Sequence, residues 1–138
     1  REVCPVSAGG GLAVGIDIGG TKIAAGVVDS DGRVLTRRNI ATPVSERQAL
    51  VDAIIGLARE LAAEHAVEAV GIGVAGLVDR AGETVRFAAH LPFRDEPLRR
   101  EVSAAIDLPV VVDNEKMEGI RRHICFLCSL IVSGTTPR

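Results

Sequence analysis

Aromatic residues are almost absent from this chain of 138 residues, which has no Trp, no Tyr and only three Phe. Hydrophobic residues nevertheless make up 47% of the sequence, so the core must be built from Ala, Val, Leu and Ile. This aliphatic content supports a packed core and argues against disorder. At this length the chain holds one ordinary domain or a piece of a larger one.

Excess charge, paired cysteines and long apolar runs are also missing. The 16 basic and 18 acidic residues give a net charge of −2, which does not indicate a nucleic-acid partner. Three cysteines cannot form a fully paired disulfide framework, so a reducing compartment is favoured. The longest apolar run, residues 124–132, is too short to span a membrane, and Gly9 to Gly11 interrupt the start where a signal peptide would be apolar. We therefore expect a soluble, cytoplasmic chain without a membrane or nucleic-acid partner.

The first half of the chain predicts strands followed by a helix. Apolar segments bounded by glycine and turn residues predict strands at 12–18, 23–28 and 34–40, which would form an antiparallel meander. Ser45 stands three residues before Gln48, the spacing of a capping box, so a helix is expected to begin there. Apolar residues at helical spacing then continue to residue 61.

The second half predicts alternating elements. Strands are expected at 69–75, 84–87 and 110–112, and a second helix from about Asp95, with Pro97 in its first turn. The order of the elements predicts an α/β fold with a mixed sheet. Residues 115–138 contain two of the three cysteines and the only Met, and lack the Ala- and Val-rich texture of the body. We expect a loose segment at 1–11, a domain at 12–114 and a divergent tail.

A glycine turn after the first strand is the most informative stretch. Its two glycines let the backbone approach a phosphate closely, and Thr21 and Lys22 add a hydroxyl and a cation. The carboxylate of Asp17 would hold Mg²⁺ through water. An ordinary hairpin turn, whose polar side chains satisfy local backbone groups, explains the same residues equally well. The residues concerned are Asp17, Gly19, Gly20, Thr21 and Lys22.

Together with Asp29, Gly32 and the segments 87–98 and 110–114, this turn resembles the ROK sugar kinases (repressor, open reading frame, kinase), and glucokinases in particular. The resemblance covers residues 12–114. It implies a ribonuclease-H-like, actin-like lobe of an ATP-dependent hexokinase. It also implies that the turn binds the phosphates of ATP and its Mg²⁺, with the roles passing by position to Asp17, Gly19, Gly20, Thr21 and Lys22.

The resemblance implies sugar-binding positions as well. Gly76 matches the loop that lines the sugar pocket, His90 lies where many members carry an Asn that contacts the sugar, and Asn114 matches a sugar-binding Asn. Glu115 occupies the place of the family's catalytic Asp, which takes the proton from the sugar's 6-hydroxyl. Its additional methylene moves the carboxylate by about 1 Å, a misplacement that can cost about 10²-fold in rate, so Glu115 is a positional candidate for the base.

The resulting expectation is a glucokinase that uses ATP to phosphorylate glucose, here as a poorly active fragment without its second lobe or the family's zinc site. The full-length form is expected to dimerise, and residues 115–138 to be frameshifted or artefactual. A non-catalytic sugar- or phosphate-binding remnant stays open, as do N-acetylmannosamine, N-acetylglucosamine or fructose as the sugar and polyphosphate as the donor. A ROK repressor is disfavoured, because the residues before Leu12 leave no room for a helix-turn-helix domain.

Two other patterns are set aside. Residues 71–76 spell GxGxxG, but these glycines fall within a predicted strand, so close packing explains them better than a dinucleotide. His123, Cys125 and Cys128 are too few ligands for a closed zinc site.

Overall fold

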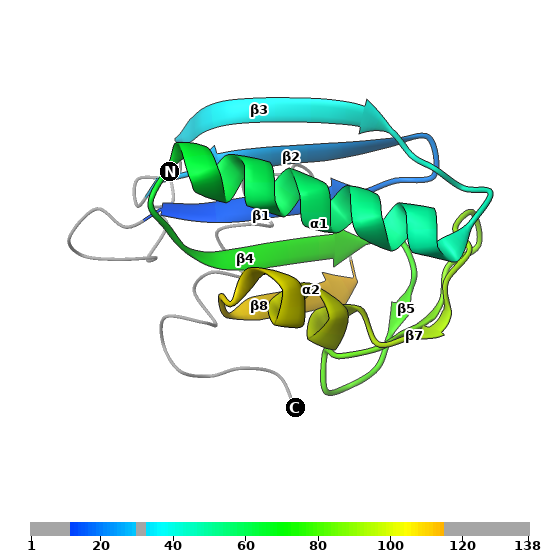
Figure 1. Ribbon diagram of the computed structural model, residues 1–138. Helices are drawn as coiled ribbons and strands as arrows, with labels where there is room; N and C mark the ends of the chain where they lie inside the picture. Colours follow the sequence, from blue (N-terminus) through cyan, green and yellow to red (C-terminus); the bar gives the residue numbers. More distant parts are fainter. Residues whose placement is uncertain (1–11, 30–32, 115–138) are drawn as a thin grey trace.

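The computed structural model describes residues 12–29 and 33–114, which form a mixed α/β fold (Figure 1). This is the predicted fold class. The elements in chain order are β1 (Leu12–Ile18), β2 (Lys22–Val28), β3 (Val34–Ala41), α1 (Arg47–Glu64), β4 (Val67–Val74), β5 (Leu77–Val78), β6 (Val85–Phe87), β7 (Arg94–Glu96), α2 (Leu98–Ile106) and β8 (Val110–Asn114). Neither helix of this described part is long and apolar enough to cross a membrane.

The main sheet has five strands in the order β3-β2-β1-β4-β8. Strands β1, β2 and β3 form the predicted antiparallel meander, while β4 and β8 run parallel to β1 and to each other. Parallel strands end at the same edge of a sheet, so the carboxyl ends of β1, β4 and β8 lie together. The glycines of the GxGxxG pattern at Gly71 and Gly73 lie inside β4, which is inconsistent with a dinucleotide-binding turn.

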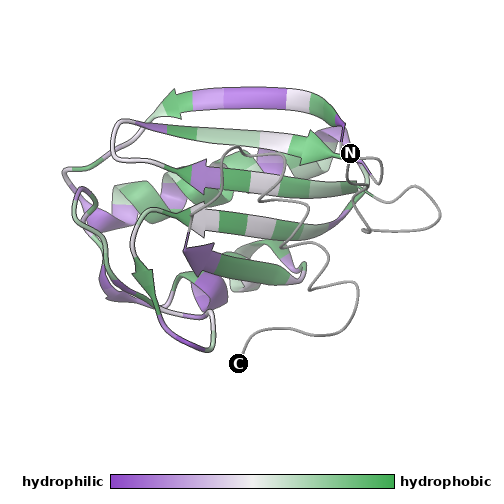
Figure 2. Ribbon diagram, turned by 180° about the vertical axis from the view of Figure 1, so that it is seen from behind, coloured by the Kyte–Doolittle hydropathy of each residue, from purple (hydrophilic) through white to green (hydrophobic). Residues whose placement is uncertain are grey.

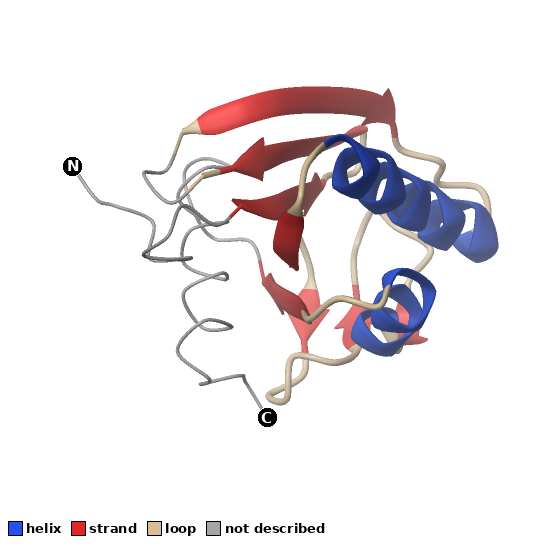
Figure 3. Ribbon diagram, turned by 60° about the vertical axis from the view of Figure 1, so that its left-hand side comes forward, coloured by secondary structure: helices blue, strands red, loops and turns tan. Residues whose placement is uncertain are grey.

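Both helices cover the same face of this sheet (Figures 1 and 3). Val14, Ile16 and Ile18 of β1 belong to the core that α1 closes. The predicted helical spacing is confirmed, since the buried residues of α1 are Leu50, Val51, Ile54, Leu57, Ala58 and Leu61. Hydrophilic residues gather on β3, whose burial alternates (Figure 2). Charged side chains of this kind protect an edge strand from pairing with other chains.

The predicted starts of both helices are wrong. Helix α1 begins at Arg47, and its N-cap Glu46 makes no side-chain capping bond. Ser45 is therefore not the N-cap, and Gln48 donates instead to Asp52, with 2.9 Å between Nε2 and Oδ1. The second helix begins at Leu98, because Asp95 and Glu96, which were expected in its first turn, belong to strand β7, and β7 pairs with β6.

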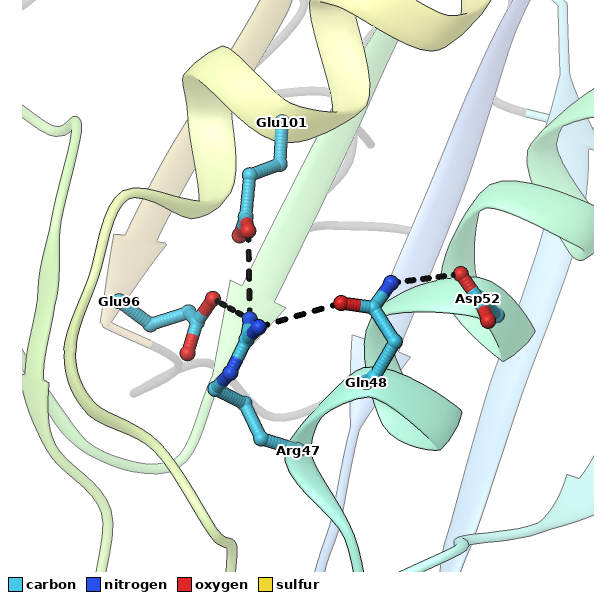
Figure 4. A network of polar contacts seen from close by, with 5 residues as sticks. All are labelled: Arg47, Gln48, Asp52, Glu96 and Glu101. Atoms are coloured by element: carbon cyan, nitrogen blue, oxygen red, sulfur yellow. Dashed lines mark hydrogen bonds and ion pairs between the residues drawn. The ribbon is translucent and has the colours of Figure 1, made fainter.

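Strands β5, β6 and β7 form a second, three-stranded sheet. An ionic network ties it to the helices (Figure 4). Arg47 of α1 donates from Nη1 to Oε2 of Glu96 on β7 at 2.5 Å and to Oε2 of Glu101 on α2 at 3.3 Å. Glu96 is only 2% exposed whereas Arg47 is 46% exposed, so the buried carboxylate is paired with a cation that still reaches solvent, and the bond joins α1 to the small sheet.

Candidate functional site

The turn between β1 and β2 lies at the edge where the parallel strands end. The Gly19 amide donates to the Lys22 carbonyl at 3.0 Å, which closes the turn. Thr42, which follows β3, fixes it from outside, because its hydroxyl donates to the Gly19 carbonyl at 2.8 Å and its amide to the Thr21 carbonyl at 3.0 Å. Thr42 was not predicted, because a residue 23 positions away carries no local signal.

Asp17 precedes this turn. Its neighbours Ile16 and Ile18 enter the core, so by the alternation of a strand Asp17 lies on the opposite face of the sheet. Its Oδ1 is buried and accepts no hydrogen bond from any residue in the described ranges. An ordinary turn would use this carboxylate to satisfy nearby backbone groups, whereas here a buried acceptor is left over. Such an atom is costly unless something else binds it.

His90 brings a second predicted segment against the turn. It is exposed, and it lies in the loop of residues 88–93 between β6 and β7. A Cβ built on Gly20 would lie 2.8 Å from the Cβ of His90, closer than real Cβ atoms come. The contact is therefore possible only because residue 20 is glycine. This packing brings the predicted phosphate turn and the predicted sugar loop together.

Gly76 and Asn114 complete the same edge. The Asn114 amide Nδ2 donates to the Gly76 carbonyl. A Cβ on Gly76 would lie 2.6 Å from the Phe87 carbonyl oxygen and 2.9 Å from the Cβ of Ala88. Gly76 thus touches both Asn114 and the start of the 88–93 loop. Four segments that are distant in sequence meet at this edge.

Two carboxylates and an ammonium group also lie at this edge. In the sheet register Asp17 stands opposite Gly73, and Gly73 stands opposite Asp113. The Oδ1 of Asp113 accepts a hydrogen bond from the backbone N–H of Asn114 at 2.7 Å, so Asp113 helps to fix the backbone at the end of β8. Lys22 begins β2 and is exposed. The edge therefore offers carboxylates for a hydrated cation and an ammonium group for an anion.

Some residues named from the sequence alone lie outside the described ranges. They are Glu115, the candidate base, and the tail residues His123, Cys125 and Cys128. Among the residues that are described, no three His, Cys, Asp or Glu side chains gather as a directly ligated metal site would require. A magnesium ion held through water by Asp17 needs no such cluster.

Comparison with known proteins decides the family. The model of the ROK family matches residues 13–117. The chain belongs to the ROK family. The identification made from the turn and from segments 87–98 and 110–114 is therefore confirmed.

Two curated relatives of the chain are sugar kinases. Over 133 residues the chain is 49% identical to the glucokinase of Streptomyces coelicolor, covering 90% of this chain and 42% of that protein. Over 103 residues it is 39% identical to the N-acetyl-D-glucosamine kinase of Salmonella typhimurium, covering 73% of this chain and 34% of that protein. The chain thus spans less than half the length of these relatives.

A solved structure confirms the fold class. The ROK glucokinase of Streptomyces griseus, in complex with glucose and AMPPNP, is 50% identical with a TM-score of 0.70, covering 75% of this chain and 33% of that one. The fold is therefore the actin-like one that the resemblance implied. The roles assigned to the individual site residues stay predictions.

Proposed function

We propose that this chain supplies the phosphate-binding turn and part of the sugar wall of a glucokinase, which transfers the γ-phosphoryl group of ATP to the 6-hydroxyl of glucose. One observation carries the proposal. The two segments assigned to phosphate and sugar by resemblance touch at one sheet edge, where Gly20 packs against His90. Asn114, bonded to Gly76, lies at the same edge.

The turn is suited to the phosphate chain of ATP. Phosphoryl transfer depends mainly on positioning and electrostatic stabilisation rather than on covalent chemistry by the protein. Gly20, Thr21 and Lys22 are all exposed, so backbone, hydroxyl and ammonium groups are accessible to phosphate oxygens. The bonds from Thr42 hold the turn in place before any ligand arrives, which lowers the entropic cost of binding.

Asp17 fits a hydrated magnesium ion. Its buried Oδ1 lacks a donor among the residues described, and the waters of Mg²⁺ are strong donors. Mg²⁺, when bound with ATP, would neutralise charge on the phosphates and orient them. Asp17 would hold that hydrated cation next to the turn without contacting the sugar.

Asn114 fits a role in orienting the sugar. Its Nδ2 donates to the Gly76 carbonyl, which turns the carboxamide so that its oxygen accepts from a sugar hydroxyl. His90 and Gly76 lie near the same edge of the sheet, where Gly20 contacts His90 and Gly76 contacts Ala88. The catalytic base would be Glu115, directly after Asn114 in the sequence, where an Asp stands in the family pattern.

A second sugar is supported by one specific observation. The relative at 39% identity is an N-acetyl-D-glucosamine kinase, so a hexose with a 2-acetamido group is the alternative substrate. Glucose is preferred because the identity to the Streptomyces glucokinase is higher and spans more of the chain.

Calorimetric titration of the 138-residue chain with glucose, N-acetylglucosamine and Mg²⁺–AMPPNP tests the proposal, and a coupled assay of ADP release tests turnover. We expect glucose to bind more tightly than N-acetylglucosamine. D17N should weaken Mg²⁺-dependent nucleotide binding about tenfold or more, the scale of one charge-assisted contact, and leave glucose unaffected. D52N, which alters an exposed carboxylate on α1, is the matched control. A folded chain that binds neither ligand at millimolar concentration contradicts the proposal.

A further inference from the structure

The 88–93 loop turns three of its carbonyl groups toward a single side chain. The Nη1 of Arg94 lies 2.7 Å from the Phe93 oxygen, 3.1 Å from the Leu91 oxygen and 3.3 Å from the Ala88 oxygen. A guanidinium Nη1 carries two N–H groups, so the three contacts share two protons. Bonds from a charged donor are stronger than those between neutral groups. One cation therefore closes the loop from its first residue to its last.

The guanidinium is held in this position from the other side. Its Cζ lies over the ring of Phe87, 4.4 Å from the ring centroid. The neighbouring carboxylate does not compete for it, because Asp95 pairs with Arg86, with 2.7 Å between Oδ1 and Nε. A planar guanidinium can stack on a ring and donate along its edge at the same time, which an ammonium group cannot do.

The loop positions a residue of the candidate site. Ala88, Leu91 and Phe93 are buried, whereas His90 between them is exposed and lies against Gly20. Burial of these apolar side chains fixes where the loop enters and leaves the core. It does not fix the path of the exposed turn that carries His90. The carbonyl contacts of Arg94 span that turn, together with the bond from the Leu91 amide to the Ala88 carbonyl.

We propose that Arg94 is a positioning residue of the hexose site, whose guanidinium holds the 88–93 loop so that His90 stays against Gly20. Arg94 acts through the loop and need not touch the sugar. The consequence for sugar binding depends on the proposed function. The effect of Arg94 on the position of the loop does not depend on the proposed function, so it can be measured without any ligand.

Nuclear magnetic resonance of the full 138-residue chain tests the hold directly. In the unsubstituted chain we expect a nuclear Overhauser effect between the His90 Hβ protons and the Gly20 Hα protons. R94A should abolish it and should speed exchange of the Leu91 amide, which bonds to the Ala88 carbonyl at 3.3 Å, by about tenfold. R94K keeps the positive charge but lacks the planar set of N–H donors of a guanidinium. It should therefore restore neither the nuclear Overhauser effect nor the slow exchange of the Leu91 amide.

R86A is the matched control. It removes an arginine from the facing strand of the same small sheet and breaks an ion pair whose partners are both more than half exposed. We expect the His90–Gly20 signal and the Leu91 exchange rate to stay unchanged in this variant. If both signals persist in R94A and R94K, Arg94 does not hold the loop. The same conclusion follows if R86A loses the two signals to the same extent as R94A.

Calorimetry then tests the consequence. We expect R94A to raise the Kd for glucose about tenfold, with the affinity for Mg²⁺–AMPPNP changed less than about twofold. Loss of the His90–Gly20 signal without any change in glucose affinity overturns the role of Arg94 in the hexose site. If the unsubstituted chain binds no glucose, the proposed function fails for this chain, while the resonance signals still decide whether Arg94 holds the loop.

Discussion

The two sheets of this molecule are held together in different ways. The five-stranded sheet has strands of five to eight residues, long ladders and a helix-covered core. The three-stranded sheet has strands of only two or three residues; its Val85 joins the core, and side chains that bond to backbone fix its loops. Arg94 donates to loop carbonyls, and Asp79 accepts from the Glu83 amide at 2.9 Å and the Thr84 amide at 3.2 Å.

This difference means that the large sheet mainly sets the stability of the chain, whereas the small sheet mainly sets the positions of loops. Hydrophobic burial in the large sheet is spread over many residues and is non-directional, so it sets the free energy of unfolding. The polar contacts of the small sheet are few and directional, so each one fixes the position of a particular loop. We therefore expect substitutions in the first region to unfold the chain, and those in the second to displace the candidate site.

The largest effect should come from I72A. Ile72 lies in the middle of β4, is fully buried, and pairs with Ile16 on one side and Val112 on the other. Truncation removes buried methyl groups and leaves a cavity, so the free energy of unfolding should fall by about 3 kcal/mol. Urea denaturation followed by circular dichroism measures this. L35A, at a side chain 46% exposed on β3, should change stability by less than about 0.5 kcal/mol.

G76A should have an intermediate effect on stability and should also disturb the site. The new Cβ would meet the Phe87 carbonyl oxygen at 2.6 Å, so the small sheet must move away from the end of β4. Overpacking of this kind costs about 1–3 kcal/mol. We also expect weaker glucose binding, because Gly76 accepts the hydrogen bond that orients Asn114. Denaturation and calorimetric titration of the same sample separate the two effects.

G56A controls for the change from glycine to alanine itself. Gly56 lies within α1, where a Cβ would have nothing within 4 Å. Alanine is the better helix former, so this variant should gain about 0.5–1 kcal/mol and leave glucose binding unchanged. If both variants lost stability equally, close packing at Gly76 would not be the cause.

The same contrast explains what the sequence could predict. The large sheet and α1 follow from patterning: apolar β1, the turn after it, and apolar residues from Leu50 to Leu61 at helical spacing. Such patterns reflect burial, which involves many residues at once. The turn at Asp17 to Lys22 was likewise visible, because glycines beside a carboxylate are a local signal.

Of the small sheet only β6 was predicted, as a strand at 84–87. Strands β5 and β7 are too short to show any period, and β7 was mistaken for the first turn of α2. The start of α1 was misplaced because Gln48 bonds to Asp52 rather than to the backbone of a cap. Arg94 and Thr42 contact loop carbonyls that come close only in the folded chain, so no residue spacing in the sequence indicates their roles.

The smallest effect concerns the network that joins the two regions. Burial raises the pKa of Glu101 to about 7, the neighbouring Glu96 carboxylate adds to the rise, and Arg47 opposes it. Within the described residues Glu101 Oε1 is buried without a hydrogen-bond partner, which further disfavours the charged form. The small sheet and α2 are thus tied to α1 through a carboxyl group that titrates near neutral pH.

The sign of the resulting pH dependence follows from linkage. The unfolded Glu101 loses its proton near pH 4.5, whereas the folded one keeps it to about pH 7, so the folded state binds more protons in between. Stability contributed by this group is therefore full below pH 4.5 and declines as the pH rises to 7. E101Q, which stays neutral, should remove that decline.

Because Glu101 is 27% exposed and solvent screens its charge, we expect a gain of only about 1 kcal/mol for E101Q at pH 8 and little change at pH 4. Urea denaturation at both values measures this. E68Q, at an exposed carboxyl on β4, supplies the background dependence to subtract. An E101Q variant that lost stability at pH 8 would show that the ionised carboxylate, through its bond to Arg47, holds the two regions together, contrary to the direction argued from burial.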